Sequence, residues 1–360
     1  MLEADAAEAR GDAQEALDVI TRHESGHDGR PFWRPWRVEA LVQLATPNLT
    51  LPRWVTSRWV LNQALQSLDR MSRPTVARAH ELAVELRGGV DALPGVDEID
   101  AMCRVMDRDW AYRQLFLYDF GGLQAFMRNG ASPDLLLGAD SLDQWARTPM
   151  GGFRLVDVQP QHITWHDLGA NESVVTDNIG SATLVEIGRY AIGRLVPVEH
   201  GRMFETPPLP VPAEVAIAVA ADPAGWLTPL RDALRTVEDT SQVMQIGHED
   251  CLVTDVPRGA WQASVADHLP ARLDLEKLAD QIARAVLDAA SSAFDHPRHT
   301  DAQDLWPCLA AALLSPAVPL GLARVARSDD AQLLQRLAER LTAGAADLCL
   351  ALARELREAA

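Results

Sequence analysis

Apolar side chains recur every three or four residues along both ends of the chain, which is typical of amphipathic helices. Near the N-terminus this spacing continues on both sides of Gly11-Asp12, so two helices joined by a turn are expected there. Two further apolar stripes follow; the second begins after Pro74, which a first helical turn tolerates, and stops at Gly88-Gly89. The pattern therefore predicts a helical domain over residues 1–148.

Two more helices are expected within this domain. Large apolar residues are dense between residues 99 and 126, and they predict one longer helix over that stretch. Ser132-Pro133 then opens another helix, which is expected to run toward Trp145.

The period changes at Pro149, where short strand-like runs alternate with turn residues. A strand is expected over residues 162–166, a turn at 169–171 and a hairpin turn at His200-Gly201. These short strands predict a small antiparallel, barrel-like β module over residues 149–212. A stiff exit linker is expected from the prolines at its end, which are Pro207, Pro208, Pro210 and Pro212.

Helical spacing returns in residues 213–360, the predicted C-terminal helical domain. Its last helix carries one apolar stripe, formed by Leu334, Leu337, Leu341, Ala345, Leu348, Leu352 and Leu356. Because the steps of this stripe average above 3.6 residues, an ordinary amphipathic helix is expected rather than a left-handed coiled coil. The whole chain is thus predicted to be an α+β protein, mostly α, whose helical N-terminal and C-terminal blocks flank the β module.

One stretch tests whether the chain enters a membrane. Residues 305–323 contain no charged side chain and are nominally long enough for a membrane-spanning helix. Pro307, Pro316 and Pro319 interrupt it, and each proline removes a backbone donor, so a buried helix followed by a bent loop is favoured. The acidic N-terminus lacks the layout of a signal peptide, and a cytoplasmic location without membrane contact is expected.

Composition narrows the set of partners. The 360 residues are 48% hydrophobic and 23% charged, which is ordinary globular usage, and their formal net charge is -18. A field of this sign repels phosphate, so indiscriminate binding to nucleic acid or to an anionic membrane is disfavoured. Reduced thiols are expected for the four scattered cysteines, which are Cys103, Cys251, Cys308 and Cys349.

Short segments of the chain carry two resemblances. The stretch from Ala9 to Leu17 resembles the turn of a tetratricopeptide-type helical hairpin, although no clear further copies follow. In segments such as 31–37 and 193–198 the chain resembles uncharacterised helical proteins common in high-GC actinobacteria. Its β segment is similar to small β modules that accompany helical repeats in bacterial proteins. These resemblances imply an architecture and no activity, so no residue role follows from them.

The sharpest candidate for catalysis is the pentapeptide His23–His27, which reads HESGH and fits the HExxH pattern of zinc metallopeptidases. In such enzymes two histidines one helical turn apart bind zinc and the glutamate polarises the bound water. His23 and His27 are therefore candidate zinc ligands, and Glu24 is the candidate catalytic residue. Gly26 and Pro31 indicate that the helix ends before His27, which favours a polar helix end with exposed histidines.

Two other histidine pairs are weaker metal candidates. His162 and His166 lie four residues apart in a predicted strand, where their side chains would be about 13 Å apart, too far to share one ion. Residues 295–301 offer histidines and aspartates in a loop without ligand spacing, so a solvated loop between helices is favoured.

A basic, aromatic segment lies between residues 30 and 60, where five arginines accompany a single acidic residue, Glu39. Guanidinium groups stack on indole rings where proteins grip partners, and stacked nucleic-acid bases would use the same groups. The competing interpretation is intramolecular stacking that locks two helices together. The candidate partner-binding residues, called the Trp/Arg island below, are Trp33, Arg34, Trp36, Arg37, Arg53, Trp54, Arg58 and Trp59.

Three functions stay open at this point. The first is a non-enzymatic scaffold or adaptor that works through protein contacts, supported by the helical hairpins, the Trp/Arg island and the amphipathic C-terminal helix. The second is a zinc-dependent hydrolase through the HESGH motif, and the third is nucleic-acid contact through the Trp/Arg island. The sequence contains no phosphate-binding glycine loop and no GxSxG nucleophile motif, which favours the adaptor. No pattern indicates the oligomeric state.

Overall fold

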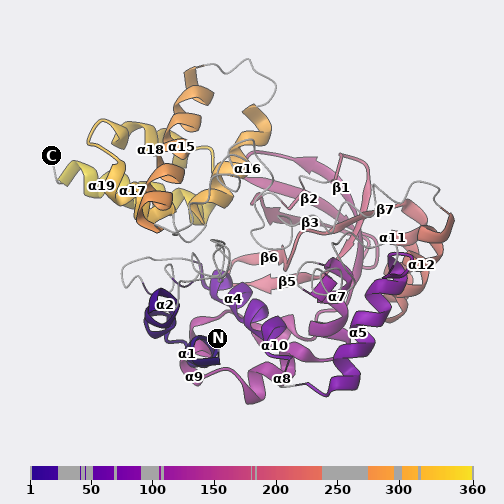
Figure 1. Ribbon diagram of the computed structural model, residues 1–360. Helices are drawn as coiled ribbons and strands as arrows, with labels where there is room; N and C mark the ends of the chain where they lie inside the picture. The colour runs from indigo at the N-terminus through magenta and orange to yellow at the C-terminus, as the bar shows by residue number, and fades with distance from the viewer. Residues whose placement is uncertain are drawn as a thin grey trace.

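The computed structural model describes residues 2–22, 41, 45, 52–68, 71–90, 105–106, 109–179, 181–182, 185–236, 275–295, 302–314 and 318–358. Helices occupy both ends of this range and short strands occupy its middle (Figure 1). The predicted class, an α+β protein that is mostly α, is therefore confirmed.

Short helices make up the N-terminal part of the chain, and α5, for example, buries an apolar stripe that includes Ala79, Leu82 and Ala83. Local sequence determines where α5 begins, because the Ser72 hydroxyl accepts a hydrogen bond from the Thr75 amide at 3.3 Å. The bounds are α1 (Leu2–Arg10), α2 (Ala13–Arg22), α4 (Arg53–Gln66), α5 (Arg73–Leu86), α7 (Trp110–Gln114), the π-helical turn η4 (Leu115–Asp119), α8 (Gly122–Asn129), α9 (Pro133–Gly138) and α10 (Leu142–Trp145).

These helices confirm one prediction and correct two. The helix pair α1 and α2 meets at Gly11, whose φ of 80° is a left-handed conformation that favours glycine. The single helix predicted over residues 99–126 is wrong in its described part, because η4 ends at Asp119 and Gly121, with a φ of 74°, precedes a new helix, α8. The helix predicted from Ser132 toward Trp145 is likewise two helices, α9 and α10.

The middle of the chain forms an antiparallel five-stranded sheet in the order β3-β2-β1-β4-β7 and a separate hairpin, β5-β6. The expected turns are confirmed, since residues 168–171 join β2 to β3 and residues 199–200 join β5 to β6. The bounds are β1 (Gly151–Val158), β2 (His162–Asp167), β3 (Glu172–Asp177), β4 (Tyr190–Gly193), β5 (Leu195–Val198), β6 (Gly201–Phe204) and β7 (Leu209–Val211).

The predicted barrel-like closure is wrong, because the described strands form an open sheet and a separate hairpin. β4 and β5 are separated only by Arg194, whose side chain is buried and donates to the Thr148 carbonyl oxygen at 2.6 Å. Since this side chain points back toward the helices, the chain leaves the five-stranded sheet at Arg194. β5 then pairs with β6 instead of extending the sheet.

The proline-rich exit is also part of the sheet. β7 pairs with β4 and places Pro210 opposite Ala191, so the predicted linker is wrong over Leu209–Val211. β7 is an edge strand, and an edge strand tolerates proline because one side of its backbone makes no ladder hydrogen bonds.

Side chains of the sheet face two different layers. On one face Phe153, Leu155, Ile163, Trp165 and Ala191 of the sheet form a small core together with Ala182, Val185 and Phe204 from outside the sheet. On the other face α11 (Ala213–Ala221) lies against β1, where a Cβ atom on Gly152 would stand 1.9 Å from the Ala216 carbonyl oxygen. Only glycine permits this approach. The short turn η5 (Pro223–Gly225) and α12 (Leu227–Thr236) follow.

The C-terminal helices form a bundle of their own (Figure 1). Residues 339–342 turn the chain so that α18 and α19 pack against each other, and the single last helix predicted from the leucine stripe is wrong. Leu337, Leu341 and Ala345 keep a spacing of four through this turn and are all buried, so the stripe could not show the break. The bounds are α15 (Leu275–Asp295), α16 (Ala302–Leu313), α17 (Val318–Val325), α18 (Asp330–Ala338) and α19 (Ala343–Glu358).

Among the described helices, none is long and apolar enough to cross a membrane. The uncharged stretch that raised the question contains most of α16, with Pro307 inside that helix, and most of α17, so the bent loop expected after the first helix is wrong from Val318 onward. Residues 315–317 between them lie outside the described part.

Candidate functional site

Most of the predicted site residues lie outside the described part of the chain. These are the zinc-site candidates His23, Glu24 and His27 and the island residues Trp33, Arg34, Trp36 and Arg37. The same holds for residues 296–300, which include both histidines of the predicted C-terminal loop. Their roles stay predictions from the sequence.

The other histidine pair is described. His162 and His166 both lie on β2, as expected, and His162 is exposed while His166 is half-buried. Within the described ranges, no three histidine, cysteine, aspartate or glutamate side chains gather in a way that could hold a metal ion.

Arg53 of the Trp/Arg island makes contacts inside the fold. It lies at the start of α4 and donates to the carbonyl oxygens of Leu137 and Ala139, at 2.8 and 2.6 Å. These two carbonyls lie at the C-terminal end of α9, where no intrahelical donor is available to them. Arg53 therefore caps α9 and holds it against α4.

The other described island residues also contact their own chain. The Arg58 guanidinium lies 4.8 Å from the centroid of the Trp54 ring, and it donates to the Phe204 carbonyl oxygen at 2.9 Å. Trp59 is 4% exposed. This part of the island holds α4 against the β module, and its use by a partner stays a prediction.

A cluster of polar side chains is buried between the N-terminal helices and the β module. Arg113 donates from Nε and Nη2 to Glu205 Oε2, each at 3.3 Å, and from Nη1 to Asn62 Oδ1 at 3.1 Å. The Glu205 side chain is 0% exposed and the Arg113 side chain is 7% exposed. Gln114 donates to the other carboxylate oxygen of Glu205. The buried charge of Glu205 is thus both paired and hydrogen-bonded, which its burial requires.

Arg194, which lies between β4 and β5, extends this cluster to Asp119. Its Nη2 donates to Asp119 Oδ1 at 2.6 Å, and its Nε donates to Gln114 Oε1 at 2.9 Å. Trp226 Nε1 donates to the second oxygen of Asp119 at 2.7 Å. Arg113 thus pairs with Glu205 and Arg194 pairs with Asp119, and Gln114 links the two pairs by hydrogen bonds to Glu205 and Arg194. This connected set, called the arginine clamp below, comprises Arg113, Gln114, Asp119, Arg194, Glu205 and Trp226.

The π-helical turn η4 brings the clamp residues of the N-terminal helices together. The amide of Phe120 donates to the Leu115 carbonyl oxygen at 2.8 Å, a bond that spans five residues and widens the helix. Tyr118 of this turn is buried, and the Arg194 guanidinium lies 4.4 Å from its ring centroid. Burial raises the pKa of Tyr118 well above its ordinary value, and Glu205 raises it further against the opposing effect of Arg113 and Arg194. A neutral phenol thus sits inside the clamp.

The arginine clamp has a structural role, because its charged side chains pair with one another. Each of its four charged groups already has a partner of opposite charge inside the clamp. The clamp connects α7 and η4 to the β module, and through Trp226 it connects them to the start of α12.

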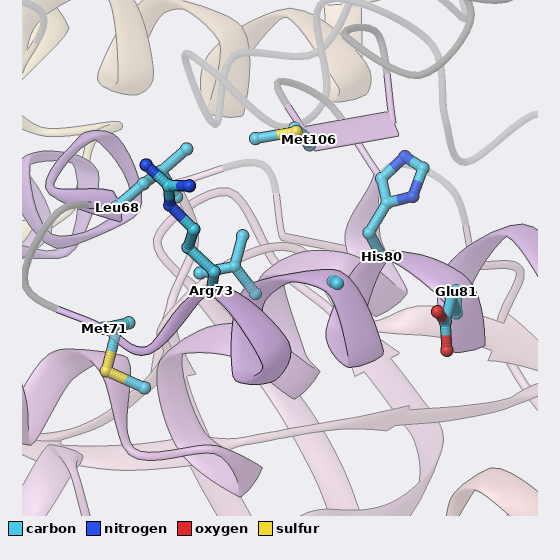
Figure 2. Close-up of a pocket in the computed structure, with 8 residues that line it drawn as sticks. Leu68, Met71, Arg73, His80, Glu81 and Met106 are labelled. Atoms are coloured by element: carbon cyan, nitrogen blue, oxygen red, sulfur yellow. The ribbon is translucent and has the colours of Figure 1, made fainter.

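A groove on α5 offers room for a ligand. Its volume is about 680 Å³, within the range of ligand pockets. Arg73 and Glu81 lie on opposite sides of it, and Met106 lies above His80 (Figure 2). The complete lining, called the α5 groove below, is Leu68, Met71, Arg73, Val76, Ala77, His80, Glu81 and Met106.

The floor of the α5 groove rests on the aromatic core. His80 is 8% exposed, and its ring meets the Tyr112 ring edge-on, with centroids 6.4 Å apart. Tyr112 in turn stacks on Phe116, with centroids 5.7 Å apart, and burial raises the pKa of Tyr112 above its ordinary value. Because this core also carries η4, one packed unit supports both the groove and the clamp.

The two charged side chains of the α5 groove, Arg73 and Glu81, differ in whether they make an ion pair with a described residue. Arg73 is exposed and makes no ion pair with any residue that the structure describes. Glu81 is also exposed, but its carboxylate pairs with Arg78 at 3.3 Å. Among the residues that the structure describes, the positive charge of Arg73 therefore has no counter-charge, whereas Glu81 has one.

Sequence reasoning missed both the clamp and the groove. The clamp partners are 75 to 107 residues apart in the pairs Arg194–Asp119 and Trp226–Asp119, so no local spacing reveals them. A signal did exist, because Arg113 and Gln114 interrupt an otherwise apolar and aromatic run. The groove gave a weaker signal, since the apolar Met71 lies just before α5 and the apolar Val76 and Ala77 lie in α5, yet none of the three is fully buried.

Comparisons with known proteins add no further assignment. No protein-family model matches the chain, and neither curated proteins nor solved structures match it. The function has to be inferred from the geometry and chemistry of the described residues.

Proposed function

We propose that this protein is a non-enzymatic adaptor that works through protein–protein contacts, and that the α5 groove is one of its contact surfaces. The groove itself carries this proposal. It offers about 680 Å³ beside mainly apolar side chains, and Arg73, Ala77 and Glu81 at its rim are exposed to solvent. Apolar lining that is open to solvent favours an apolar side chain from a partner, because binding removes both surfaces from water.

The side chains that line the groove suit a protein partner. Met71 and Met106 have flexible, unbranched side chains, which adapt to the shape of an incoming group and are common at binding surfaces. One fully buried apolar anchor would contribute about 1.5–3 kcal/mol. The Trp/Arg island remains a second candidate contact surface of the same adaptor.

Filling the groove tests the proposal. Ala77→Trp places an indole in the groove at an exposed position, so the chain should still fold. Ala218→Trp is the matched control, because it makes the same change at an exposed position of α11. Partners of the full chain are identified in its native host by a photo-crosslinking side chain at position 77. We expect Ala77→Trp to weaken binding of the crosslinked protein about 10- to 100-fold, while Ala218→Trp leaves it unchanged.

Two results would contradict the proposed contact surface. One is a set of crosslinks from position 77 that all stay within the chain, because a segment of the protein itself would then cover the groove. The other is a crosslinked partner whose affinity is the same for the Ala77→Trp and Ala218→Trp variants.

A further inference from the structure

The α5 groove has a defined length. Arg73, Ala77 and Glu81 follow one another at a spacing of four residues along α5, so they share one face of the helix. The eight steps from Arg73 to Glu81 rise about 12 Å along the axis. The groove therefore offers a strip a little over two helical turns long.

The two ends of this strip differ in charge. Arg73 is the first residue of α5, where the unsatisfied amides of the helix add about half a positive charge. At the other end the Glu81 carboxylate is negative, and Arg78 at 3.3 Å partly offsets its charge. A ligand would thus meet its strongest electrostatic attraction at Arg73.

We infer that the occupant of the α5 groove is an amphipathic helix of a partner protein, which lies antiparallel to α5 and places an acidic side chain against Arg73. This inference rests on the adaptor function proposed above. Beside this face, the apolar side chains of Leu68, Met71, Val76 and Met106 suit a helix whose own apolar side chains recur at every third or fourth position. The antiparallel direction puts the negative, C-terminal end of that helix beside Arg73 and its positive end beside Glu81.

The apolar contacts fit the same orientation. Leu68 and Arg73 both line the groove and are drawn on the same side of it in Figure 2, so an anchor near the acidic side chain would pack on Leu68. A second anchor, one turn toward the N-terminus of the bound helix, would pack between Val76 and Met106 above His80. The apolar anchors then supply the affinity, and Arg73 fixes the direction of the helix.

The inference is tested with displayed peptides. A library of amphipathic helical peptides, about four turns long, with apolar and charged residues varied, is selected on the full chain and counter-selected on the Ala77→Trp variant. We expect the enriched peptides to share apolar residues at helical spacing and an acidic residue toward the C-terminal end. Peptides without helical apolar spacing, or with no charge preference at that end, would overturn the inference.

Charge exchange tests the role of Arg73 directly. For an enriched peptide, Arg73→Glu should weaken binding about five- to tenfold, whereas Arg73→Lys should change it less than about twofold. Replacing the acidic residue of the peptide by lysine should restore binding to the Arg73→Glu chain. If Arg73→Glu binds as tightly as the unchanged protein, or if the exchange restores nothing, the proposed orientation is wrong.

The failures of the two proposals can be told apart. A selection that yields no groove-dependent peptide overturns the helical occupant, and crosslinking in the native host still tests the adaptor. Conversely, tight helical peptides combined with crosslinks only inside the chain would mean that a helix of the chain itself fills the groove. That result overturns both proposals.

Discussion

The arginine clamp and the α5 groove are both supported by the aromatic core around Tyr112 and Phe116. They differ in whether their charged side chains are paired within the fold. In the clamp, Glu205 is 0% exposed and meets Arg113 directly. In the groove, Arg73 is exposed and makes no ion pair with any described residue. The clamp residues pair with one another, whereas Arg73 has no counter-charge among the described residues.

Charged side chains that support the fold differ in burial and pairing from charged side chains that are candidates for binding a partner. A buried charge has to be paired, because leaving it alone costs several kcal/mol, so its partner is found inside the fold. An exposed charge has no such requirement and usually signifies little by itself. Arg73 gains significance only because it borders a groove with an apolar lining.

Glu205→Ala should give the largest effect. It leaves the Arg113 guanidinium buried without its counter-charge, so the free energy of unfolding should fall by about 3–5 kcal/mol. Glu172→Ala is the matched control, because Glu172 pairs with Arg202 at 3.5 Å with both side chains about half exposed, and it should cost less than about 1 kcal/mol. Urea unfolding followed by circular dichroism measures both. Equal losses in the two variants would show that Glu205 does not behave as a buried ion.

Alkaline pH should loosen the packed unit between the clamp and the groove. Burial raises the pKa of both Tyr112 and Tyr118 above the ordinary value of 10.0, so the folded protein keeps these protons at a pH where the unfolded chain loses them. The stability that this contributes is complete below pH 10 and is lost as pH rises through the folded pKa.

The double variant Tyr112→Phe/Tyr118→Phe isolates this effect. Above pH 10 the unchanged protein should lose up to about 1.4 kcal/mol per pH unit for each of the two tyrosines beyond what the variant loses. Thermal unfolding across pH 9 to 11 measures the difference. Parallel pH profiles of the two proteins would mean that neither phenol is held neutral by the fold.

Arg73→Ala should give the smallest effect on stability. Since the Arg73 side chain is exposed and makes no ion pair with a described residue, its removal should change the free energy of unfolding by less than about 0.5 kcal/mol. Arg113→Ala, the same substitution in the clamp, should cost about 3–5 kcal/mol. A large loss from Arg73→Ala would mean that this arginine supports the fold, and it would remove the contrast between the two regions.

Sequence periodicity predicted the helices well where their apolar stripes end at clear stop signals. The helix pair around Gly11 and the β hairpins at residues 168–171 and 199–200 formed as expected, because glycine and the turn residues mark these places locally. Periodicity gave the wrong helix bounds where a turn between two helices preserves the spacing of the apolar residues. Leu337 and Leu341 lie on either side of the start of such a turn and still sit four residues apart.

The candidate site was harder to predict because its residues are defined by their neighbours in space. Glu205 follows a strand and looks like an exposed loop residue, and only the approach of Arg113, 92 residues earlier, makes it a buried ion. Met71 and Met106 look like ordinary core residues, and only the fold shows that they border a groove. The Trp/Arg island was conspicuous in the sequence, and its described arginines, Arg53 and Arg58, hold α4 in place.

The sequence separation of the clamp also has a consequence for synthesis of the protein. Arg113 leaves the ribosome 92 residues before Glu205, an interval of about 5–20 s at ordinary elongation rates. During that time the growing chain exposes the side of η4 that later meets the β module, including the aromatic ring of Tyr118. Contacts between such distant residues form slowly, and the exposed surface can associate with other chains meanwhile. The N-terminal helices thus gain the cover of this surface only after the β module has been synthesised.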